Sequence, residues 1–334
     1  MRILILGGTA WLGRHLVEAA RAKGHDVACL ARGTSATVPR GARLVRADRT
    51  LPNAYDQVLD QRWDAVIDVA RQPGQVRNAA LALAKRASTY VFISSASVYA
   101  DHATPCQDES AALLPPLQAD VMEDMNSYGQ AKVACEQQVL AAFGEERSLI
   151  VRPGLIGGPG DESDRTGYWP LRFAKAAGSD RPVLIPDEPG LSTQVIDARD
   201  LARWVVDRAC AGEVGTFNAT GEAIGLPEHL ALARHVGGHR GRVVSAGSAW
   251  LAKQGVTPWM GEKSLPLWLP MPEYAGFSTR DSSAAVKAGL SRRSLEATLR
   301  DTLDWELSRA PAPAGRRAGL SDADEALLLG ILEK

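Results

Sequence analysis

The chain has 334 residues, of which 45% are hydrophobic and 23% charged, enough for one large globular domain or two smaller ones. Its formal net charge of −1 provides no general positive field for a polyanion, so we expect no nucleic-acid partner. The four cysteines form no C-x-x-C pair, and no apolar run reaches membrane-spanning length. We therefore predict a cytoplasmic protein without disulfides, metal or membrane contact.

The first 14 residues, MRILILGGTAWLGR, predict a buried strand, a glycine turn and the start of a helix. Gly7 and Gly8 end the strand, and Gly13 lies in the first helical turn. Backbone N–H groups at such a helix N-terminus can bind a diphosphate. Ala10 replaces the middle glycine of a G-x-x-G-x-x-G spacing, and its methyl group narrows the approach of a phosphate without preventing it. A tight turn that binds nothing is the alternative interpretation.

The end of the second predicted strand, residues 26–31, bears on the choice of cofactor. A site for NAD usually places Asp or Glu here, to accept a hydrogen bond from the ribose 2′-hydroxyl. This chain has Arg32 instead. The residues that follow it are small or carry hydroxyls: Gly33, Thr34 and Ser35. A guanidinium near hydroxyls suits a 2′-phosphate, so we predict NADP, with NAD possible and a solvated arginine as the competing interpretation.

Helices and strands alternate through the next hundred residues. We predict a third strand at residues 44–48, a fourth at 64–69, a helix at 74–86, a fifth strand at 89–94, a helix at 127–143 and a sixth strand at 148–152. Such alternation predicts a parallel sheet covered on both faces, with ligands beyond the carboxyl ends of its strands. Asp48, Ala70 and Ser95 lie at such ends, and Asp48 is placed to lie by the adenine.

The second half of the chain alternates less regularly. Residues 101–124 predict a loop over the site, and the Gly- and Pro-rich residues 153–189 predict an irregular, substrate-shaping region. The elements predicted beyond it are strands at 193–196, 216–218 and 242–245, and helices at 198–211, 227–235, 248–254, 282–287 and 295–307. Residues 310–319 read as a linker, and the capping-box spacing at Ser321 predicts a final helix that docks on the body or on a second subunit.

The helix at 127–143 carries the residues that point to chemistry. Tyr128 and Lys132 are four residues apart, hence on one helix face. Tyrosine is a weak acid, and a neighbouring ammonium and a positively charged nicotinamide both favour its phenolate. Such a tyrosine can exchange a proton with a carbonyl or alcohol oxygen while hydride moves to or from the cofactor. Ser95 is placed to orient the same oxygen, and Ser97 is a second candidate because an extended strand would point both hydroxyls to one side.

These segments together resemble an extended short-chain dehydrogenase/reductase of the NAD(P)-dependent epimerase/dehydratase family. The matching segments are GGTAWLG, ISSASVY, YGQAK with Cys135 and Glu136, Arg152-Pro153-Gly154, and VIDARDLA at residues 195–202. The resemblance implies a Rossmann-type doubly wound parallel sheet with a smaller mixed α/β C-terminal substrate domain. It also implies a small-molecule substrate and a homodimer through the helices at 74–86 and 127–143. Trp11 stands where the family usually has phenylalanine, which we expect to change only the packing under the turn.

The resemblance assigns roles to individual residues. The catalytic residues it implies are Ser95, Tyr128 and Lys132. The cofactor-binding residues it implies are Gly7, Thr9, Ala10, Trp11, Leu12, Arg32, Asp48, Ala70, Lys132 and Pro153. The candidates for substrate contact are Ser97, Arg165, Trp169 and Gln194. Packing of an irregular loop explains the aromatic residues of this region equally well, and Trp250, Trp259 and Trp268 read as core or lid residues.

We expect residues 1–153 and about 193–220 to form the cofactor domain, residues 154–192 and 221–310 the substrate region, and residues 311–334 a linker and docking helix. Arg40, Arg43, Arg46 and Arg49 predict a positive patch for the adenosine phosphates, or a solvated face. His229, His235 and His239 are interpreted as exposed, without a metal, because Gly237-Gly238 disrupts a helical arrangement.

Three functions remain open at this point. The first is an NADP-dependent oxidoreductase acting on a carbonyl or alcohol. The second is a nucleotide-sugar epimerase or dehydratase with retained NAD, which Arg32 and the tryptophan-rich residues 255–277 disfavour. The third is a non-catalytic NAD(P)-binding regulatory or RNA-binding relative, which the mild acidity and the intact set of Ser95, Tyr128 and Lys132 disfavour.

Overall fold

The computed structural model describes residues 1–34, 37–309 and 315–333; Ser35 and the first part of the predicted linker lie outside them. Its largest sheet has seven strands in the order β10-β6-β5-β4-β1-β2-β3, and every neighbouring pair is parallel. The strands are β1 (Arg2–Leu6), β2 (Asp26–Ala31), β3 (Arg43–Arg46), β4 (Trp63–Asp68), β5 (Ala87–Ile93), β6 (Ser148–Pro153) and β10 (Gly215–Ala219). This order reverses direction at β1 and β4, where doubly wound sheets bind ligands.

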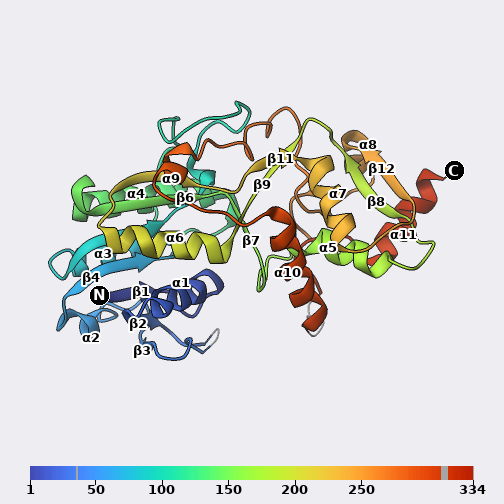
Figure 1. The fold of residues 1–334 in the computed structure, drawn as a ribbon. Helices are drawn as coiled ribbons and strands as arrows, with labels where there is room; N and C mark the ends of the chain where they lie inside the picture. Colours follow the sequence, from blue (N-terminus) through green and yellow to red (C-terminus); the bar gives the residue numbers. More distant parts are fainter. Residues whose placement is uncertain (35–36, 310–314, 334) are drawn as a thin grey trace.

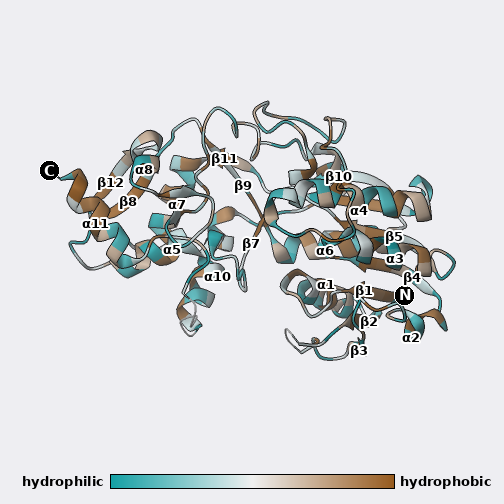
Figure 2. Ribbon diagram, turned by 180° about the vertical axis from the view of Figure 1, so that it is seen from behind, coloured by the Kyte–Doolittle hydropathy of each residue, from teal (hydrophilic) through white to brown (hydrophobic). Residues whose placement is uncertain are grey.

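Helices cover both faces of this sheet (Figure 1). One face carries α1 (Trp11–Ala22) and α6 (Ala198–Ala211), and the other carries α2 (Asp56–Leu59), α3 (Pro73–Leu83) and α4 (Tyr128–Phe143). Within β1, Ile3 and Ile5 face the first core, and Leu4 and Leu6 face the second. Figure 2 shows hydrophobic colour concentrated on these central strands and both colours on the covering helices. The predicted doubly wound parallel sheet is confirmed.

The register of the sheet brings several predicted site residues to one edge. Leu6 pairs with Leu30 of β2 on one side and with Asp68 of β4 on the other, and Asp68 pairs with Phe92 of β5. Gly7 and Arg32 directly follow β1 and β2, and Ala70 and Ser95 lie two residues beyond the ends of β4 and β5. They therefore share the carboxyl edge, as the sequence predicts for parallel strands.

A second, smaller part of the chain lies beside the large sheet, with β7 and β9 between the two (Figure 1). Its elements are β7 (Leu155–Gly157), α5 (Arg165–Ala176), β8 (Val183–Asp187), β9 (Ser192–Asp197), β11 (Ala223–Gly225), α7 (Leu226–Val236), β12 (Val243–Gly247), α8 (Ser248–Lys253), β13 (Thr257–Pro258), β14 (Ser264–Leu265), α10 (Leu295–Ser308) and α11 (Asp322–Leu332). They form the sheets β11-β9-β7, β12-β8 and β13-β14 around a third apolar core. Helix α9 (Ser283–Lys287) instead packs beside the large sheet, with Ala285 in its core.

The prediction that residues 153–189 are irregular is wrong. This stretch contains β7, the 12-residue helix α5 and β8, although α5 includes Pro170. Trp169 and Phe173 of α5 are 0% and 1% exposed in the third apolar core. Burial of this helix face stabilises α5 against the unfavourable local effect of proline.

The final helix docks on its own chain. Ser321 caps α11 by accepting a hydrogen bond from the backbone N–H of Asp324 at 3.0 Å, as its spacing predicts. Glu325 forms an ion pair with Arg172 of α5 and accepts a hydrogen bond from the Leu184 N–H of β8 at 3.0 Å. Helix α11 therefore packs on α5 and β8.

Two of the three histidines expected on the surface are buried. His229 is 0% exposed with Nδ1 3.0 Å from the Thr193 hydroxyl, His239 is 5% exposed, and only His235 is exposed. Burial lowers the pKa of His229 to about 4, so it is neutral and acts as a core residue. Within the described ranges, no three His, Cys, Asp or Glu side chains gather as metal ligands. No helix in those ranges is both long and apolar enough to cross a membrane.

Candidate active site

The glycine turn is a tightly packed strand-to-helix junction. Gly7 has φ of +95°, in the region that favours glycine. A Cβ atom at Gly13 would lie 2.2 Å from the carbonyl oxygen of Gly7, so only glycine lets α1 pack this closely on the turn. Ala10 precedes α1 in extended conformation and is exposed, so its methyl group causes no local distortion. The turn thus presents the open N-terminus of α1 at the carboxyl edge of β1.

Trp11 does more than change the packing under this turn. Its indole Nε1 donates a hydrogen bond to the carbonyl oxygen of Pro159 at 2.9 Å. Pro159 belongs to the loop that joins β7 to α5, in the smaller part of the chain. Trp11 therefore ties the predicted cofactor turn to the loop that precedes α5, a contact that phenylalanine cannot make. Of the other turn residues, Thr9 is buried and Leu12 packs against the first core.

Two exposed guanidiniums lie near the end of β2. Arg32 follows β2 directly, and a Cβ atom at Gly33 would lie 3.9 Å from Nε of Arg46. Asp48, beyond β3, accepts hydrogen bonds from the N–H and hydroxyl of Thr50 at 3.0 and 2.8 Å. These bonds, with a smaller contribution from the charge of Arg32, lower the pKa of Asp48. The edge thus offers two cations and one carboxylate where the adenosine half of a dinucleotide is predicted to bind.

One of the four arginines predicted to form a positive patch is buried instead. Arg49 donates two hydrogen bonds to the carboxylate of Asp68, both at 2.7 Å, and is 9% exposed. It is therefore a buried ion-pair partner and is not available to a phosphate. The three that remain exposed are Arg40, Arg43 and Arg46.

Tyr128 and Lys132 lie as their spacing predicts. The Lys132 ammonium donates to the carbonyl oxygens of Ala70 and Ile93, both at 2.7 Å, and lies 5.9 Å from the centre of the Tyr128 ring. Lys132 is 3% exposed, whereas Tyr128 is half-buried. The two carbonyls stand at the carboxyl ends of β4 and β5, so the sheet itself fixes the ammonium beside the phenol.

The serine segment folds differently from the extended strand that we predicted. After Ser95 the chain turns into a short 3-10 helix, η1 (Ala96–Val98), and Ser95 caps it by accepting a hydrogen bond from the Ser97 N–H at 3.1 Å. The two hydroxyl oxygens still lie 3.2 Å apart. A Cβ atom at Gly129 would lie 2.2 Å from the Ser97 carbonyl oxygen, so α4 begins in contact with this turn. Tyr128, directly before Gly129, therefore stands at the start of α4, where this helix meets the turn.

A buried polar network beneath this site was missed by the sequence analysis. Glu136 of α4 receives hydrogen bonds from Nε and a terminal nitrogen of Arg152 at 3.0 and 2.7 Å, and the Ser94 hydroxyl also donates to it. Arg152 donates to the Tyr99 hydroxyl at 3.2 Å, and that hydroxyl donates to Asn218 at 2.6 Å. The sequence signal for this network is Glu136, a carboxylate that lies one turn beyond Lys132 on a largely buried helix. The network holds α4, β5, β6 and β10 together under the site.

The four substrate candidates have different surroundings. Ser97 lies in the serine turn, and Arg165 stacks on the ring of Trp259 with its guanidinium carbon 4.9 Å from the ring centre. The structure does not bring Trp169 to the site, because its indole is fully buried and donates to the Pro266 carbonyl at 2.8 Å. Gln194 is 5% exposed, and its amide bonds both backbone groups of Arg280, at 2.8 and 3.1 Å.

The cofactor candidate Pro153 ends β6. It is buried and pairs in register with Ala219 of β10. It therefore lies at the same carboxyl edge as Ser95 and Ala70.

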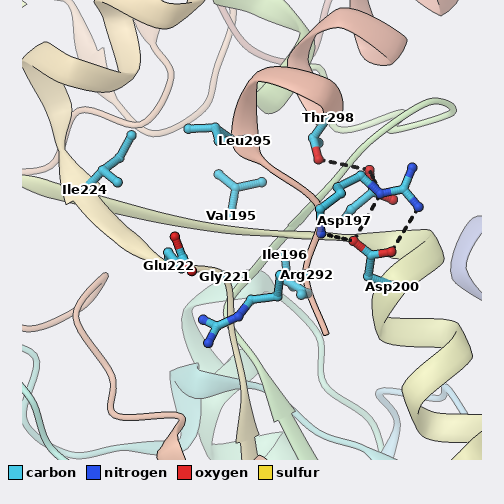
Figure 3. Close-up of a pocket in the computed structure, with 11 residues that line it drawn as sticks. Val195, Ile196, Asp197, Asp200, Gly221, Glu222, Ile224, Arg292, Leu295 and Thr298 are labelled. Atoms are coloured by element: carbon cyan, nitrogen blue, oxygen red, sulfur yellow. Dashed lines mark hydrogen bonds and ion pairs between the residues drawn. The ribbon is translucent and has the colours of Figure 1, made fainter. Parts of the chain in front are cut away.

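A small pocket of about 50 Å³ between β9, α6 and α10 is not a second ligand site (Figure 3). Its two carboxylates are already bonded: Asp197 accepts from the Thr298 hydroxyl at 3.1 Å, and Asp200 accepts from Arg293 at 2.9 Å. Its volume holds no more than a few water molecules. These contacts instead hold α10 against α6.

Comparison with known proteins identifies relatives of this chain. The sequence model of the NAD dependent epimerase/dehydratase family matches residues 3–213. The chain is 29% identical over 266 residues to 2′-dehydrokanamycin reductase of Streptomyces kanamyceticus, covering 76% of this chain and 72% of the relative. It is 26% identical over 219 residues to dTDP-4-dehydrorhamnose reductase of Mycobacterium tuberculosis, covering 64% and 68%.

Solved structures show the same fold. UDP-N-acetylglucosamine 4-epimerase of Bacillus cereus superimposes with a TM-score of 0.67 at 20% identity, covering 94% of this chain and 99% of that one. UDP-glucose 4-epimerase of Thermus thermophilus, solved as a complex with NAD, superimposes with a TM-score of 0.63 at 17% identity, covering 93% of this chain and 100% of that one.

Proposed function

Because this chain belongs to the NAD-dependent epimerase/dehydratase family, we propose that it is an NADP-dependent oxidoreductase that interconverts a carbonyl and an alcohol on a small molecule. The observation that carries the proposal is the Lys132 ammonium, held by Ala70 and Ile93 beside the Tyr128 ring. Named reductases among the relatives support the same reaction class.

The residues at the carboxyl edge fit a dinucleotide. The turn at Gly7 leaves the N-terminus of α1 open to a diphosphate, and Ala10 narrows this space by one methyl group only. Arg32 and Asp48 would hold the adenosine ribose and base, while Ala70 and Pro153 would border the nicotinamide. A nicotinamide bound there supplies or accepts the hydride.

The chain's own residues move the proton. In reduction, the Tyr128 hydroxyl gives its proton to the developing oxyanion, and in oxidation the phenolate removes the proton of the alcohol. The Lys132 ammonium stabilises the phenolate form and would bind the nicotinamide ribose hydroxyls. Ser95 donates a hydrogen bond to the same substrate oxygen, and the Ser97 backbone N–H fixes the position of the Ser95 oxygen.

We predict that Ser95→Ala lowers kcat about 100-fold, because one preorganised donor to the developing oxyanion is lost. Ser97→Ala is expected to lower kcat less than about 10-fold, since the Ser97 N–H still holds Ser95. Stopped-flow measurement of hydride transfer compares the two variants. A larger loss in Ser97→Ala would assign the oxygen-orienting role to Ser97.

The proposed preference for NADP depends on Arg32. We expect Arg32→Asp to weaken NADPH binding about 10- to 100-fold relative to NADH, because a charge-assisted bond to the 2′-phosphate is replaced by repulsion. Fluorescence titration with both nucleotides gives the two dissociation constants. Arg62→Asp is the matched control, since Arg62 is also exposed but precedes β4 at the opposite edge. An unchanged ratio of the two constants in Arg32→Asp would remove the argument for NADP.

A nucleotide-sugar epimerase or dehydratase is the second candidate, because the family model that matches this chain is named for these two activities. An epimerase keeps its cofactor between turnovers, so the purified protein would hold NAD tightly. Mass spectrometry of nucleotide released on denaturation separates the two candidates. A homodimer through α3 and α4 remains a prediction from the family resemblance.

A further inference from the structure

Arg165 is a half-buried cation without a carboxylate partner. It is the first residue of α5, and its Nε donates to the Ser163 hydroxyl at 3.0 Å. Across the parts of the chain that the structure describes, no Asp or Glu oxygen lies within 4.0 Å of its guanidinium. Its flat face rests on the ring of Trp259, 4.9 Å away. One face and one nitrogen are thus fixed, and the terminal nitrogens are left to bind something else.

The other buried arginines have partners for their terminal nitrogens. Arg49, Arg152 and Arg172 each form an ion pair with a buried carboxylate. Arg280 stacks on Tyr99 and still donates to three acceptors, the Asp101 carbonyl, His102 and Gln107. Arg165 differs from these four because its one side-chain hydrogen bond among the described residues is the bond from Nε to Ser163, which leaves both terminal nitrogens without a protein partner.

The surroundings of Arg165 link it to the reacting end of the site. Burial lowers the pKa of Arg165, while the charges of Asp161 and Tyr128 act in the opposite direction. The Trp11–Pro159 hydrogen bond fixes the loop that leads to Arg165 onto the cofactor turn. Arg165 thus belongs to the segment that this hydrogen bond joins to the cofactor turn.

An aromatic wall extends from Trp259, whose ring covers one face of this guanidinium. Trp259 packs edge-on against Phe277 at 5.4 Å, and Phe277 contacts Tyr274 at 6.0 Å and His102 at 5.1 Å. The wall joins the loop at residues 101–124 to the segment at 255–280. Gly276 N–H donates to the His102 carbonyl at 2.8 Å, which fixes the two segments together. In such a low-dielectric setting an ion pair with an incoming group is strong.

We propose that Arg165 and Trp259 bind an anionic group, a carboxylate or a phosphate, on the substrate whose carbonyl reacts at Tyr128. The inference rests on the proposed function for the position of that carbonyl. The terminal nitrogens of Arg165 hold two oxygens of the anion, and the aromatic wall excludes water from the pair. A substrate carrying positive charge at this end is disfavoured.

Binding to the protein–NADPH complex tests the site without requiring turnover. The probes are benzoylformate as carboxylate, phenyl phosphate as phosphate, and methyl benzoylformate as the neutral counterpart, each titrated by calorimetry. We expect Arg165→Gln to weaken binding of an anionic probe about 10- to 100-fold and to leave the ester unchanged. Arg181→Gln, at an exposed arginine before β8, is the matched control and should change neither. The probe that loses more affinity identifies the kind of anion.

Failure of this inference differs from failure of the proposed function. If NADPH-dependent reduction proceeds equally well with acid and ester, in wild type and in Arg165→Gln, the anion site is wrong and the oxidoreductase stands. If an anion binds through Arg165 but no carbonyl probe is reduced, the anion site stands and the proposed reaction is in question. The inference is overturned if wild type and Arg165→Gln bind every anionic probe with equal affinity. It is also overturned if neither protein binds any anionic probe. A steady-state loss is expected in KM more than in kcat, and Arg165→Lys should recover part of it.

Discussion

Replacing Tyr128 by phenylalanine is expected to lower kcat about 10²- to 10⁴-fold, the usual contribution of a positioned general acid or base. The phenyl ring keeps its place at the start of α4, and Lys132 keeps its two bonds to the Ala70 and Ile93 carbonyls. Only the hydroxyl that exchanges the proton disappears. Cofactor affinity and the free energy of unfolding should therefore change little.

The measurement is single-turnover hydride transfer with any carbonyl compound that wild type reduces, alongside NADPH titration. Tyr168→Phe serves as the matched control, since it removes a tyrosine hydroxyl in the buried core of the smaller part. Its kcat should equal that of wild type. If Tyr128→Phe reduces every competent substrate at the wild-type rate, Tyr128 is not the acid and the proposed mechanism is wrong.

The sequence was sufficient to predict the large sheet and much of its edge. The predicted strand at 26–31 and helix at 198–211 coincide with β2 and α6. Their boundaries follow from local signals: Asp197 caps α6 by accepting from the Arg199 N–H, and Gly212 ends it with positive φ. Helical spacing alone placed Tyr128 and Lys132 on one face. Features determined by local chain chemistry were therefore predictable.

Features determined by contacts between distant segments of the chain were not predictable from the sequence. Arg49 was assigned to a positive patch because its neighbours in sequence are arginines, and only the fold shows Asp68 beside it. Helix α5 was missed because its Gly and Pro content indicates a loop, while its stability comes from burying Trp169. Arg165 is a substrate candidate in the sequence, but Trp259, on which it stacks, belongs to a segment far along the chain, so their pairing had no local signal.

The buried pair of Arg49 and Asp68 is expected to dominate the response of stability to mutation. Asp68 is 0% exposed and accepts from Arg49 twice, from the Tyr90 hydroxyl at 2.7 Å and from the Ala70 N–H at 2.9 Å. Asp68→Asn leaves the Arg49 charge buried without its counterion, so the free energy of unfolding should fall by about 3–5 kcal/mol. Asp60→Asn, at an exposed carboxylate, should change it by less than about 0.5 kcal/mol. Urea denaturation at pH 7 compares the two.

The same pair predicts a pH dependence whose sign is fixed. Burial alone would raise the pKa of Asp68, but the charge and hydrogen bonds of Arg49, with those of Tyr90 and Ala70, outweigh burial and lower it. A carboxyl with a lower pKa in the folded state stabilises the fold above its unfolded-state pKa of about 3.9. That stabilisation is lost as the pH falls through the folded-state pKa. Wild type should therefore lose its advantage over Asp68→Asn in acid; a constant difference down to pH 2 would contradict this.

A double variant separates the ion pair from its effect on the site. If Arg49 and Asp68 act as a pair, Arg49→Met should lower the free energy of unfolding far less in the Asp68→Asn variant than it does in wild type. Asp68 also accepts from the N–H of Ala70, whose carbonyl receives the Lys132 ammonium. Loss of the carboxylate should therefore loosen Lys132 and lower kcat even at temperatures where the variant is fully folded. Additive losses of unfolding free energy in the double variant would show that Arg49 and Asp68 are not coupled. An unchanged kcat would show that the pair does not support the active-site lysine.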